Sequence, residues 1–314
     1  MRIIDPHIHL FDLQLGQYDW LKDDSPPFWP DKKLINRSFG ERDLSIEGLA
    51  IDNNNAKNKE LAGFVHIEAG FDNDQPWKEI EWLESTCLMP FKSIAFADLT
   101  LPPNEFSLLI RRLQTYKSFV GVRHILDDQA VSILAVTSVN ENLKLLADNQ
   151  LIFELQADLI CPRSFAAITK AIALAELESH TSLKVVINHA GLPPLNKATN
   201  GSVDKSADLK IEQHEFTLWL ECLKKLSASP SVSIKCSGWE MLDRQYSIAQ
   251  AITVIDEIIT IFGESRVMVA SNFPLCTLTT SYQEYWHQLL ENLEYSSAQK
   301  KALSHDNAFS IYGF

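Results

Sequence analysis

Two histidines separated by a single residue, His7 and His9, are the clearest chemical feature of the sequence. They follow a short apolar run that has the length of a buried strand. In an extended chain, residues i and i+2 point the same way, so both imidazoles can face one pocket. Paired imidazoles suit ligation of a divalent metal or polarisation of a substrate carbonyl. Two polar residues at the start of a loop are the alternative interpretation.

A third histidine and an arginine end other apolar runs. His189 closes the run at 183–188, and Arg123 with His124 closes the run at 119–124. Arginine can bind a carboxylate with two parallel hydrogen bonds, so a substrate contact is one interpretation. An ion pair with a neighbouring aspartate, Asp127 for example, is equally compatible with the sequence. His189 is either part of a histidine cluster or a histidine bonded to backbone.

Two more charged residues lie inside strand-like runs. Glu68 ends the run at 62–68, where it shares a face with His66, and we predict that Glu68 is nearer the pocket. Lys235 lies within the run at 232–237 and is either a buried structural cation or a substrate contact. The sequence does not separate these two interpretations of Lys235.

The elements that must position these residues alternate regularly along the chain. Eight short apolar runs are separated by segments of helical period, and they lie at 3–6, 62–68, 93–99, 119–124, 151–156, 183–188, 232–237 and 266–271. Strand then helix, eight times over 314 residues, predicts one α/β domain, a (β/α)8 TIM barrel spanning 1–314. An open doubly wound sheet usually has fewer strands and often a glycine-rich first turn, which this chain lacks.

Two stretches interrupt the alternation, and both follow strands. Residues 10–60 are rich in Pro, Asp, Asn and aromatics, and residues 192–210 are polar. Because loops after strands lie on the catalytic face of a barrel, we predict that 10–60 forms a lid over the pocket. Trp20, Phe28 and Trp29 are the aromatics expected to close over a substrate. A solvated insertion is the alternative.

Composition excludes several classes of partner. The formal net charge of -13 argues against nucleic acid, whose phosphates need a basic face, and against an anionic membrane surface. No apolar run approaches the ~20 residues of a membrane span, and no secretory signal opens the chain. The five cysteines are scattered and are expected to be reduced thiols. We therefore predict a cytoplasmic protein with a small-molecule partner; the oligomeric state is not predicted.

These residues together resemble the second amidohydrolase group of the amidohydrolase superfamily, which includes sugar-lactone and 2-pyrone-4,6-dicarboxylate lactonases. The resemblance covers nearly the whole chain. Five motifs carry it in order: Ile4-Asp5-Pro6-His7-Ile8-His9-Leu10, Gly121-Val122-Arg123-His124, Asn188-His189-Ala190-Gly191, Lys235-Cys236-Ser237-Gly238, and Asp306-Asn307-Ala308 followed by Tyr312-Gly313. The resemblance implies a TIM barrel whose catalytic residues include His7, His9 and His189.

One position departs from the family pattern. The family usually ends its eighth strand with G-S-D-W/F-P, in which the Asp takes a proton from the attacking water. Here the segment reads Ala270-Ser271-Asn272-Phe273-Pro274. An amide can orient water but cannot act as a general base near neutral pH. We therefore expect Asn272 to position water, with His189, His124 or Glu68 as the base, or else different chemistry or a loss of catalysis.

The resemblance predicts a hydrolase that opens a lactone of a small sugar acid or a carboxylated ring. His7, His9 and His189 would polarise the carbonyl, directly or through a divalent metal, with zinc the expected ion. Because the anionic Asp is missing, we favour the absence of a tightly bound metal. Arg123, His124, Glu68, Lys235 and Trp29 are the predicted substrate-binding residues. The alternatives are a zinc-dependent decarboxylase or hydrolase of the same superfamily and a ligand-binding barrel without catalysis.

Overall fold

The computed structural model describes residues 1–314 except 23, 47–58, 180 and 196–204, and it describes only the backbone of 205–212. Parts of the two predicted interruptions, 47–58 and 196–204, therefore lie outside the described residues. None of the helices in the described part of the chain is long and apolar enough to cross a bilayer. All five cysteines are free thiols, as expected.

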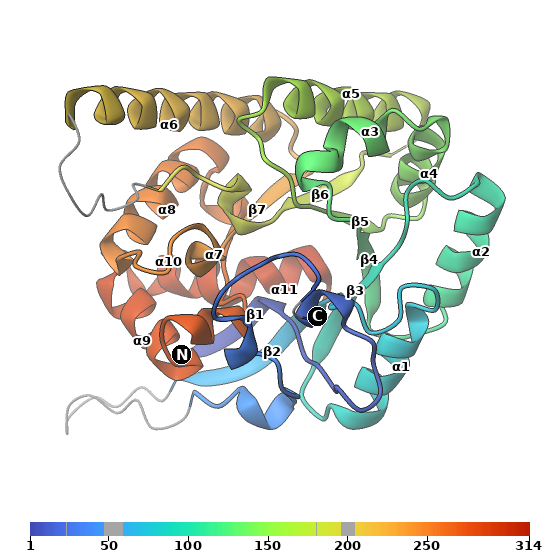
Figure 1. The fold of residues 1–314 in the computed structure, drawn as a ribbon, viewed down its shortest axis with the longest axis horizontal. Coiled ribbons are helices and arrows are strands. Elements are labelled where there is room, and N and C mark those ends of the chain that lie inside the picture. The colour runs from blue at the N-terminus through green and yellow to red at the C-terminus, as the bar shows by residue number, and fades with distance from the viewer. Residues whose placement is uncertain (23, 47–58, 180, 196–204) are drawn as a thin grey trace.

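Eight parallel strands form one sheet in sequence order, which confirms the predicted TIM barrel (Figure 1). They are β1 (Arg2–Ile8), β2 (Glu60–Ile67), β3 (Phe91–Phe96), β4 (Phe119–Arg123), β5 (Ile152–Leu155), β6 (Lys184–Ile187), β7 (Val232–Cys236) and β8 (Val267–Val269). The last strand meets the first where Ile8 bridges Phe273 and the His9 N–H donates to the Phe273 carbonyl over 2.7 Å. This contact brings residues 271–273 beside the end of β1, and thus beside the paired histidines.

Helices surround the strands. They are α1 (Trp77–Thr86), α2 (Pro103–Leu113), α3 (Ala130–Leu134), α4 (Thr137–Asp148), α5 (Pro162–Glu178), α6 (Lys205–Ser227), α7 (Trp239–Leu242), α8 (Ile248–Phe262), α9 (Tyr282–Asn292), α10 (Ser297–Lys301) and α11 (Asn307–Tyr312). Short helical turns are η1 (Asp19–Leu21), η2 (Lys32–Leu34), η3 (Glu41–Asp43), η4 (Asp127–Gln129), η5 (His189–Gly191), η6 (Glu264–Arg266), η7 (Leu275–Leu278) and η8 (Ala302–Asp306). Helix α6 begins inside the stretch predicted to be a polar loop.

Individual residues explain where helix α8 begins and ends and why β4 and β5 approach each other closely. Ser247 caps α8 by accepting a hydrogen bond from the Gln250 N–H, and Gly263 ends that helix with φ 74°. Between β4 and β5, a Cβ on Gly121 would lie 2.3 Å from the Ile152 carbonyl oxygen. Only glycine permits this approach of the two strands, so Gly121 sets the packing directly below Arg123.

The core has two parts. A large apolar cluster lies between strands and helices, and a smaller one gathers side chains such as Ile4, Val65 and Met268. Helix α11 adds Ala308 and Tyr312 to the smaller cluster. The barrel is therefore a packed core rather than a channel, as in other barrels of this class, and polar residues collect where the strands end.

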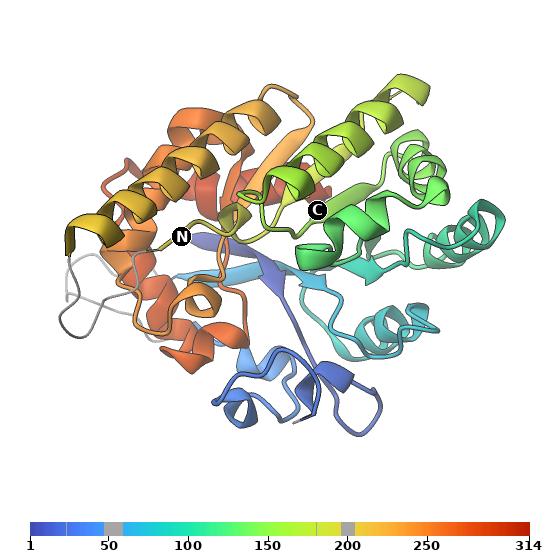
Figure 2. The ribbon, with the colours of Figure 1, turned by 45° about the horizontal axis from the view of Figure 1, so that its top comes forward.

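The insertion after β1 is largely built on its own apolar contacts. Phe11 pairs with Phe39 through a two-residue antiparallel bridge, and Tyr18 packs against Phe11 and Phe71. Figure 2 shows this blue segment beyond the end of the β1 arrow. Burial of these aromatics fixes the insertion against the barrel, which is why it can supply a wall to a pocket.

Candidate active site

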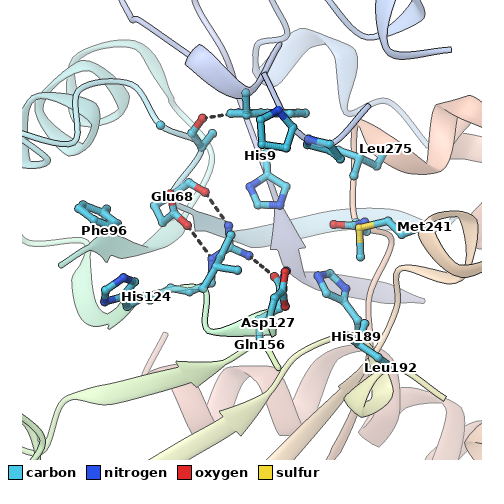
Figure 3. A pocket seen from close by; sticks show the side chains of 18 of the residues that line it. His9, Glu68, Phe96, His124, Asp127, Gln156, His189, Leu192, Met241 and Leu275 are labelled. Carbon is cyan, nitrogen blue, oxygen red and sulfur yellow. Dashed lines mark hydrogen bonds and ion pairs between the residues drawn. The ribbon is translucent and has the colours of Figure 1, made fainter. Parts of the chain in front are cut away.

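A cavity of about 680 Å³ opens where the strands end, and five of its lining residues come from five different elements. They are His9 after β1, Glu68 after β2, Arg123 on β4, His189 after β6 and Asn272 after β8. Figure 3 shows the labelled His9, Glu68 and His189 around this cavity. The structure therefore brings together most of the residues predicted from the sequence.

Of the two N-terminal histidines, His9 lies at the cavity and His7 lies deeper in the barrel. The His9 Nδ1 is 2.8 Å from the Ile67 carbonyl oxygen, so Nδ1 carries the proton and Nε2 presents a lone pair. The Nε2 atoms of His7 and His9 are 3.2 Å apart, and His7 Nδ1 has no hydrogen-bond partner among the described residues. His9 lines the cavity, whereas His7 is completely buried and does not line it.

The third histidine is held by the chain that leaves β7. Ser237 Oγ lies 3.1 Å from His189 Nδ1. Gly238 follows with φ 74°, and a Cβ there would lie 2.5 Å from that same ring nitrogen. The Ser237-Gly238 pair of the predicted K-x-S-G motif therefore has a physical role: serine bonds the imidazole, and glycine leaves room for it.

All three imidazoles are neutral at physiological pH. Burial, together with nearby cations such as Lys235 and Arg123, lowers the pKa of His7, His9 and His189 well below the usual value near 6.5. A neutral imidazole donates one N–H and accepts at its other nitrogen. This cluster can polarise a carbonyl by hydrogen bonding, without presenting a positive charge.

The opposite wall of the cavity is charged. Arg123 Nε donates to Glu68 Oε1 over 2.7 Å, its Nη2 donates to the Glu68 carbonyl over 2.9 Å, and its Nη1 donates to Gln156 Oε1 over 3.1 Å. These bonds are the dashed lines beside Glu68 and Gln156 in Figure 3. The guanidinium is thus paired within the chain, with Glu68 rather than with the neighbouring aspartates that the sequence suggested. Burial nevertheless raises the pKa of Glu68, against the pull of Arg123.

Two further residues complete this wall. His124 Nδ1 accepts from the Leu99 N–H over 3.1 Å, which leaves Nε2 as a donor, and His124 lines the cavity as predicted. Asp127 also lines it, and burial raises the pKa of this carboxyl. Sequence reasoning considered Asp127 only as an ion-pair partner, because nothing in the sequence shows that η4 turns it inward.

Four lining residues other than glycine have left-handed backbone conformations, which are unfavourable for most side chains; one is Leu192 with φ 55°, and the other three are polar. Their φ angles are 33° for Asp127, 51° for His189 and 60° for Asn272. Such conformations cost about 1–3 kcal/mol each and concentrate at functional sites. Their coincidence in one cavity is an independent indication that this cavity is the functional site.

Asn272 has a partner that the sequence did not indicate. Its Nδ2 donates to Glu240 Oε1 over 2.6 Å, and Glu240 is completely buried on α7. Burial raises the pKa of Glu240 to about 7. A carboxylate therefore lies directly behind the position where the family usually has its aspartate.

Asp5, the acidic residue of the first motif, ties β1 to its neighbours. Its Oδ1 accepts from the Ser271 N–H over 3.1 Å and from the His7 N–H over 3.2 Å, and its Oδ2 accepts from the Tyr282 hydroxyl over 3.1 Å. Asp5 is fully buried, and burial raises its pKa to about 6. The motif aspartate thus positions the histidine segment rather than contacting a ligand.

Lys235, a predicted substrate-binding residue, lies away from the cavity, and so does His66. The Lys235 Nζ is 2.5 Å from Glu154 Oε2, and both side chains are completely buried. Lys235 does not line the cavity, so the prediction of a substrate contact is corrected to a buried structural cation. His66 accepts from the Leu10 N–H and lies 3.2 Å from Glu79, so only Glu68 of that strand reaches the cavity.

The insertion supplies aromatic lining. Trp20 and Trp29 line the cavity, and Trp20 Nε1 is fixed to the Ala69 carbonyl over 2.8 Å. Phe28 is 73% exposed and does not line the cavity, so its predicted place over a substrate is wrong. Arg244 forms an ion pair with Asp31 at 2.7 Å and lies over the Trp29 ring, which ties the insertion to the chain after α7.

The donor atoms do not make a complete metal site. The 3.2 Å between His7 and His9 nitrogens is close to the ~3.3 Å between two nitrogen ligands of tetrahedral zinc. However, within the described ranges no three His, Cys, Asp or Glu side chains are grouped so as to hold an ion. The predicted set of His7, His9 and His189 is therefore not a formed zinc site, and Asn272 adds no anionic donor.

With this geometry established, similarity to known proteins decides the family. The amidohydrolase family profile, Amidohydro_2, matches residues 4–314. The chain belongs to this amidohydrolase family. An uncharacterized protein, y4mH of Sinorhizobium fredii, is 29% identical over 324 residues and covers 99% of this chain and 98% of its own. The predicted family and barrel are thus confirmed.

Other amidohydrolases and lactonases are more distantly similar. An L-fucono-1,5-lactonase of Burkholderia multivorans is 28% identical over 111 residues, covering 33% of this chain and 34% of its own. A B. multivorans amidohydrolase crystallised with zinc has a TM-score of 0.74 at 19% identity, with both chains fully covered. A Pseudomonas putida protein assigned as a 2-pyrone-4,6-dicarboxylic acid hydrolase has a TM-score of 0.65 at 19% identity, covering 99% and 97%.

Proposed function

We propose that this amidohydrolase opens a small lactone by attack of water on the ring carbonyl. The observation that carries the proposal is one cavity in which two neutral imidazoles and an amide, those of His9, His189 and Asn272, face the Glu68–Arg123 pair. Acyl hydrolysis needs donors for the developing oxyanion and a base for water, and the two walls can supply one each. The lactonase among the similar proteins supports the same substrate class.

The donor in this mechanism is His189. When the Ser237 hydroxyl donates a hydrogen bond to Nδ1, the ring proton is on Nε2 of His189. This N–H then donates a hydrogen bond to the carbonyl oxygen of the substrate. Burial keeps water away from this bond and makes it stronger than the same bond in solvent. His9 and His7 support the arrangement as a hydrogen-bonded pair below it.

Glu68 is the base. Arg123 occupies its Oε1, which leaves Oε2 for water, and a pKa above the usual range makes the carboxylate a better proton acceptor near neutrality. The water oxygen forms the new bond to the carbonyl carbon while its proton passes to Glu68. The ring C–O bond then breaks, and the proton moves from Glu68 to the leaving alkoxide, which gives the hydroxy acid.

The charges around the cavity favour an uncharged sugar lactone over a dicarboxylate. Arg123 is paired with Glu68, Lys235 with Glu154 and Arg244 with Asp31, so these cations are neutralised within the chain. Asp127 adds a negative charge to the lining when ionised. Hydroxyl groups can bond to His124, Gln156 and Asp127, whereas a second carboxylate would be repelled.

A related structure contains zinc, and a dihydroxybenzoic acid decarboxylase of similar fold contains manganese. At the predicted metal positions of this chain the donors are the imidazoles of His7, His9 and His189, and the strand-eight position is an amide rather than a carboxylate, which suits weak rather than tight divalent binding. We therefore propose hydrolysis that depends on hydrogen-bond donors and Glu68 and does not require a tightly held metal.

The proposal is tested by turnover of two lactones. L-fucono-1,5-lactone and 2-pyrone-4,6-dicarboxylate are supplied to purified protein, with and without prior dialysis against EDTA, and acid release is followed. We expect faster hydrolysis of the fuconolactone, unchanged by EDTA, and loss of activity in Glu68→Gln. Preference for the dicarboxylate would contradict the charge argument, and loss of activity that zinc restores would establish metal dependence.

A barrel that only binds ligands is the second candidate, because Asn272 replaces the usual base. It predicts saturable binding of both lactones by calorimetry without acid release, and no change in either property when Asn272→Asp is introduced. Turnover by the parent protein excludes it.

A further inference from the structure

We propose that Glu240 is a positioning residue, which fixes the Asn272 side chain so that its carbonyl oxygen serves as the acceptor that orients the attacking water. The inference deepens the proposed lactone hydrolysis and rests on it for the role of that water. It assigns a function to a buried carboxylate that takes no part in the chemistry described above.

The contact itself defines which end of the amide is which. Asn272 Nδ2 donates to Glu240 Oε1 over 2.6 Å, and the ionised form of Glu240, which predominates above its pKa of about 7, has no hydrogen to donate. The Nδ2 atom of the Asn272 amide therefore faces the ionised Glu240, and the Oδ1 atom points away from it. A bond to an ionised acceptor is roughly twice as strong as a neutral one, so this orientation is held most firmly above pH 7, where Glu240 is ionised.

The remaining atoms of the pair are available. Asn272 Oδ1 and Glu240 Oε2 are both buried, and neither accepts a hydrogen bond from any described residue. Buried acceptors are nearly always bonded to protein or to water, and Asn272 lines the cavity. An acceptor beside the cavity whose partner is not a protein group is suited to a water that also reaches the substrate carbonyl.

Glu240 lies where it can hold the Asn272 side chain but cannot contact a substrate. Glu240 is 0% exposed and does not line the cavity, and Arg244 donates to its backbone carbonyl. Tyr246, Cys276 of η7 and Tyr285 of α9 are the other titratable groups near it among the described residues. The carboxylate therefore acts through Asn272 and not on the substrate.

The same short segment also positions the other catalytic side chain with a left-handed backbone. Ser237 bonds His189, Gly238 leaves space for its ring, and Glu240 follows two residues later to bond Asn272. One turn after β7 thus holds both His189 and Asn272 in strained conformations. Strain of this kind persists only where the surrounding structure enforces it.

The first test is independent of catalysis. In protein labelled with ¹⁵N-asparagine, the side-chain amide resonance of Asn272 is assigned by its loss in Asn272→Ala. We expect the proton bonded to Glu240 to be shifted downfield in the parent, to move in Glu240→Ala, and to be retained in part in Glu240→Gln, whose amide oxygen can still accept. An unchanged Asn272 resonance in Glu240→Ala overturns the proposal, whatever the enzyme hydrolyses.

Tyr285→Phe provides the matched structural control. The Tyr285 hydroxyl donates to the Ala270 carbonyl over 2.6 Å, so its loss removes a buried bond beside β8 and leaves the bond between Asn272 and Glu240 intact. We expect this variant to lower the melting temperature while leaving the Asn272 resonance in place. A shift of that resonance equal to the one in Glu240→Ala would mean that general loosening, rather than Glu240, controls the amide.

The second test is a double-mutant cycle on hydrolysis of L-fucono-1,5-lactone. Glu240→Ala should lower kcat about 10-fold or more with little change in KM, and Glu240→Gln should recover most of that loss. In the Asn272→Ala background, Glu240→Ala should cost nothing further, because a positioning residue acts only through its partner. Additive losses overturn the proposal. If the lactone is not hydrolysed at all, the proposed function fails, and the amide resonance still decides the role of Glu240.

Discussion

The two walls of the cavity are built on opposite electrostatic principles. On the side of β1, β6 and β8, the groups are neutral: His9, His189 and Asn272 are held by a carbonyl, a hydroxyl and a hidden carboxylate. On the side of β2, β4 and β5, Glu68 and Arg123 form a buried ion pair supported by Gln156. Figure 3 shows the labelled Glu68 and His189 on opposite sides of the cavity.

Because the two walls differ in charge, we expect substitutions on them to differ in how strongly they affect the stability of the fold. The imidazoles of His9 and His189 are bonded to a carbonyl and a hydroxyl, so either can be removed without leaving a buried charge. An ion pair that is 5% and 7% exposed cannot, because either partner alone is a charge without compensation. We therefore expect substitutions on the charged wall to destabilise the fold, in addition to the loss of the base when Glu68 is replaced, and substitutions of the imidazoles on the neutral wall to slow the reaction with less effect on stability.

The largest effect is expected from Arg123→Met. It leaves Glu68 buried without its partner, which typically costs about 3–5 kcal/mol of unfolding free energy. Urea denaturation followed by circular dichroism measures the loss. The double variant Arg123→Met/Glu68→Gln removes the stranded charge and should recover a large part of it. A single variant as stable as the parent would show that the pair is more solvated than its burial indicates.

The next effect belongs to the neutral wall. His189→Ala removes the donor for the developing oxyanion, and loss of one such donor lowers kcat about 100- to 1000-fold. Only the Ser237 hydroxyl is left without its partner, so the unfolding free energy should fall much less than in Arg123→Met. Steady-state kinetics on L-fucono-1,5-lactone and the same urea titration check both halves. If His189→Ala retained full kcat, the polarising role would pass to another group.

The barrel and its main site residues were predictable because they depend on local pattern. Alternation of apolar runs with helical segments predicts the order of β1 to β8, and strand ends converge in a barrel wherever their residues lie in sequence. His9, His189 and Arg123 follow directly from that geometry. Gly121 and Gly238, by contrast, are explained only when the Ile152 carbonyl and the His189 ring are seen against them.

Partners brought together by tertiary packing were not predictable. Glu240 reaches Asn272 across 32 positions, and Lys235 pairs with Glu154 across the barrel, so no local period links either pair. Asp127 lines the cavity from a position with φ 33°, a backbone conformation that no local period in the sequence predicts. Phe28 and Trp29 are adjacent aromatics in one loop, and only their packing decides that Trp29 alone lines the cavity.

The smallest effect is expected from the ion pair that fixes the insertion after β1 to the chain after α7. Asp31 pairs with Arg244, and the Arg244 side chain lies over Trp29, which lines the cavity. Because Arg244 holds the pKa of Asp31 below its usual range, the carboxylate is ionised at neutral pH, and Asp31→Asn removes the attraction. The pair is about a quarter exposed, so its contribution is about 0.2–1 kcal/mol, equivalent to a rise in KM of at most ~5-fold with kcat unchanged.

The matched control for this effect is Asp43→Asn, which removes the ion pair with Arg37 in the same insertion at residues that do not line the cavity. It should leave KM for the lactone unchanged. The difference between the two variants should also diminish in 1 M NaCl, because screening weakens exposed pairs. An equal rise in KM for both variants would mean that the whole insertion loosens, whereas a rise confined to Asp31→Asn assigns substrate retention to the contact between Arg244 and Trp29.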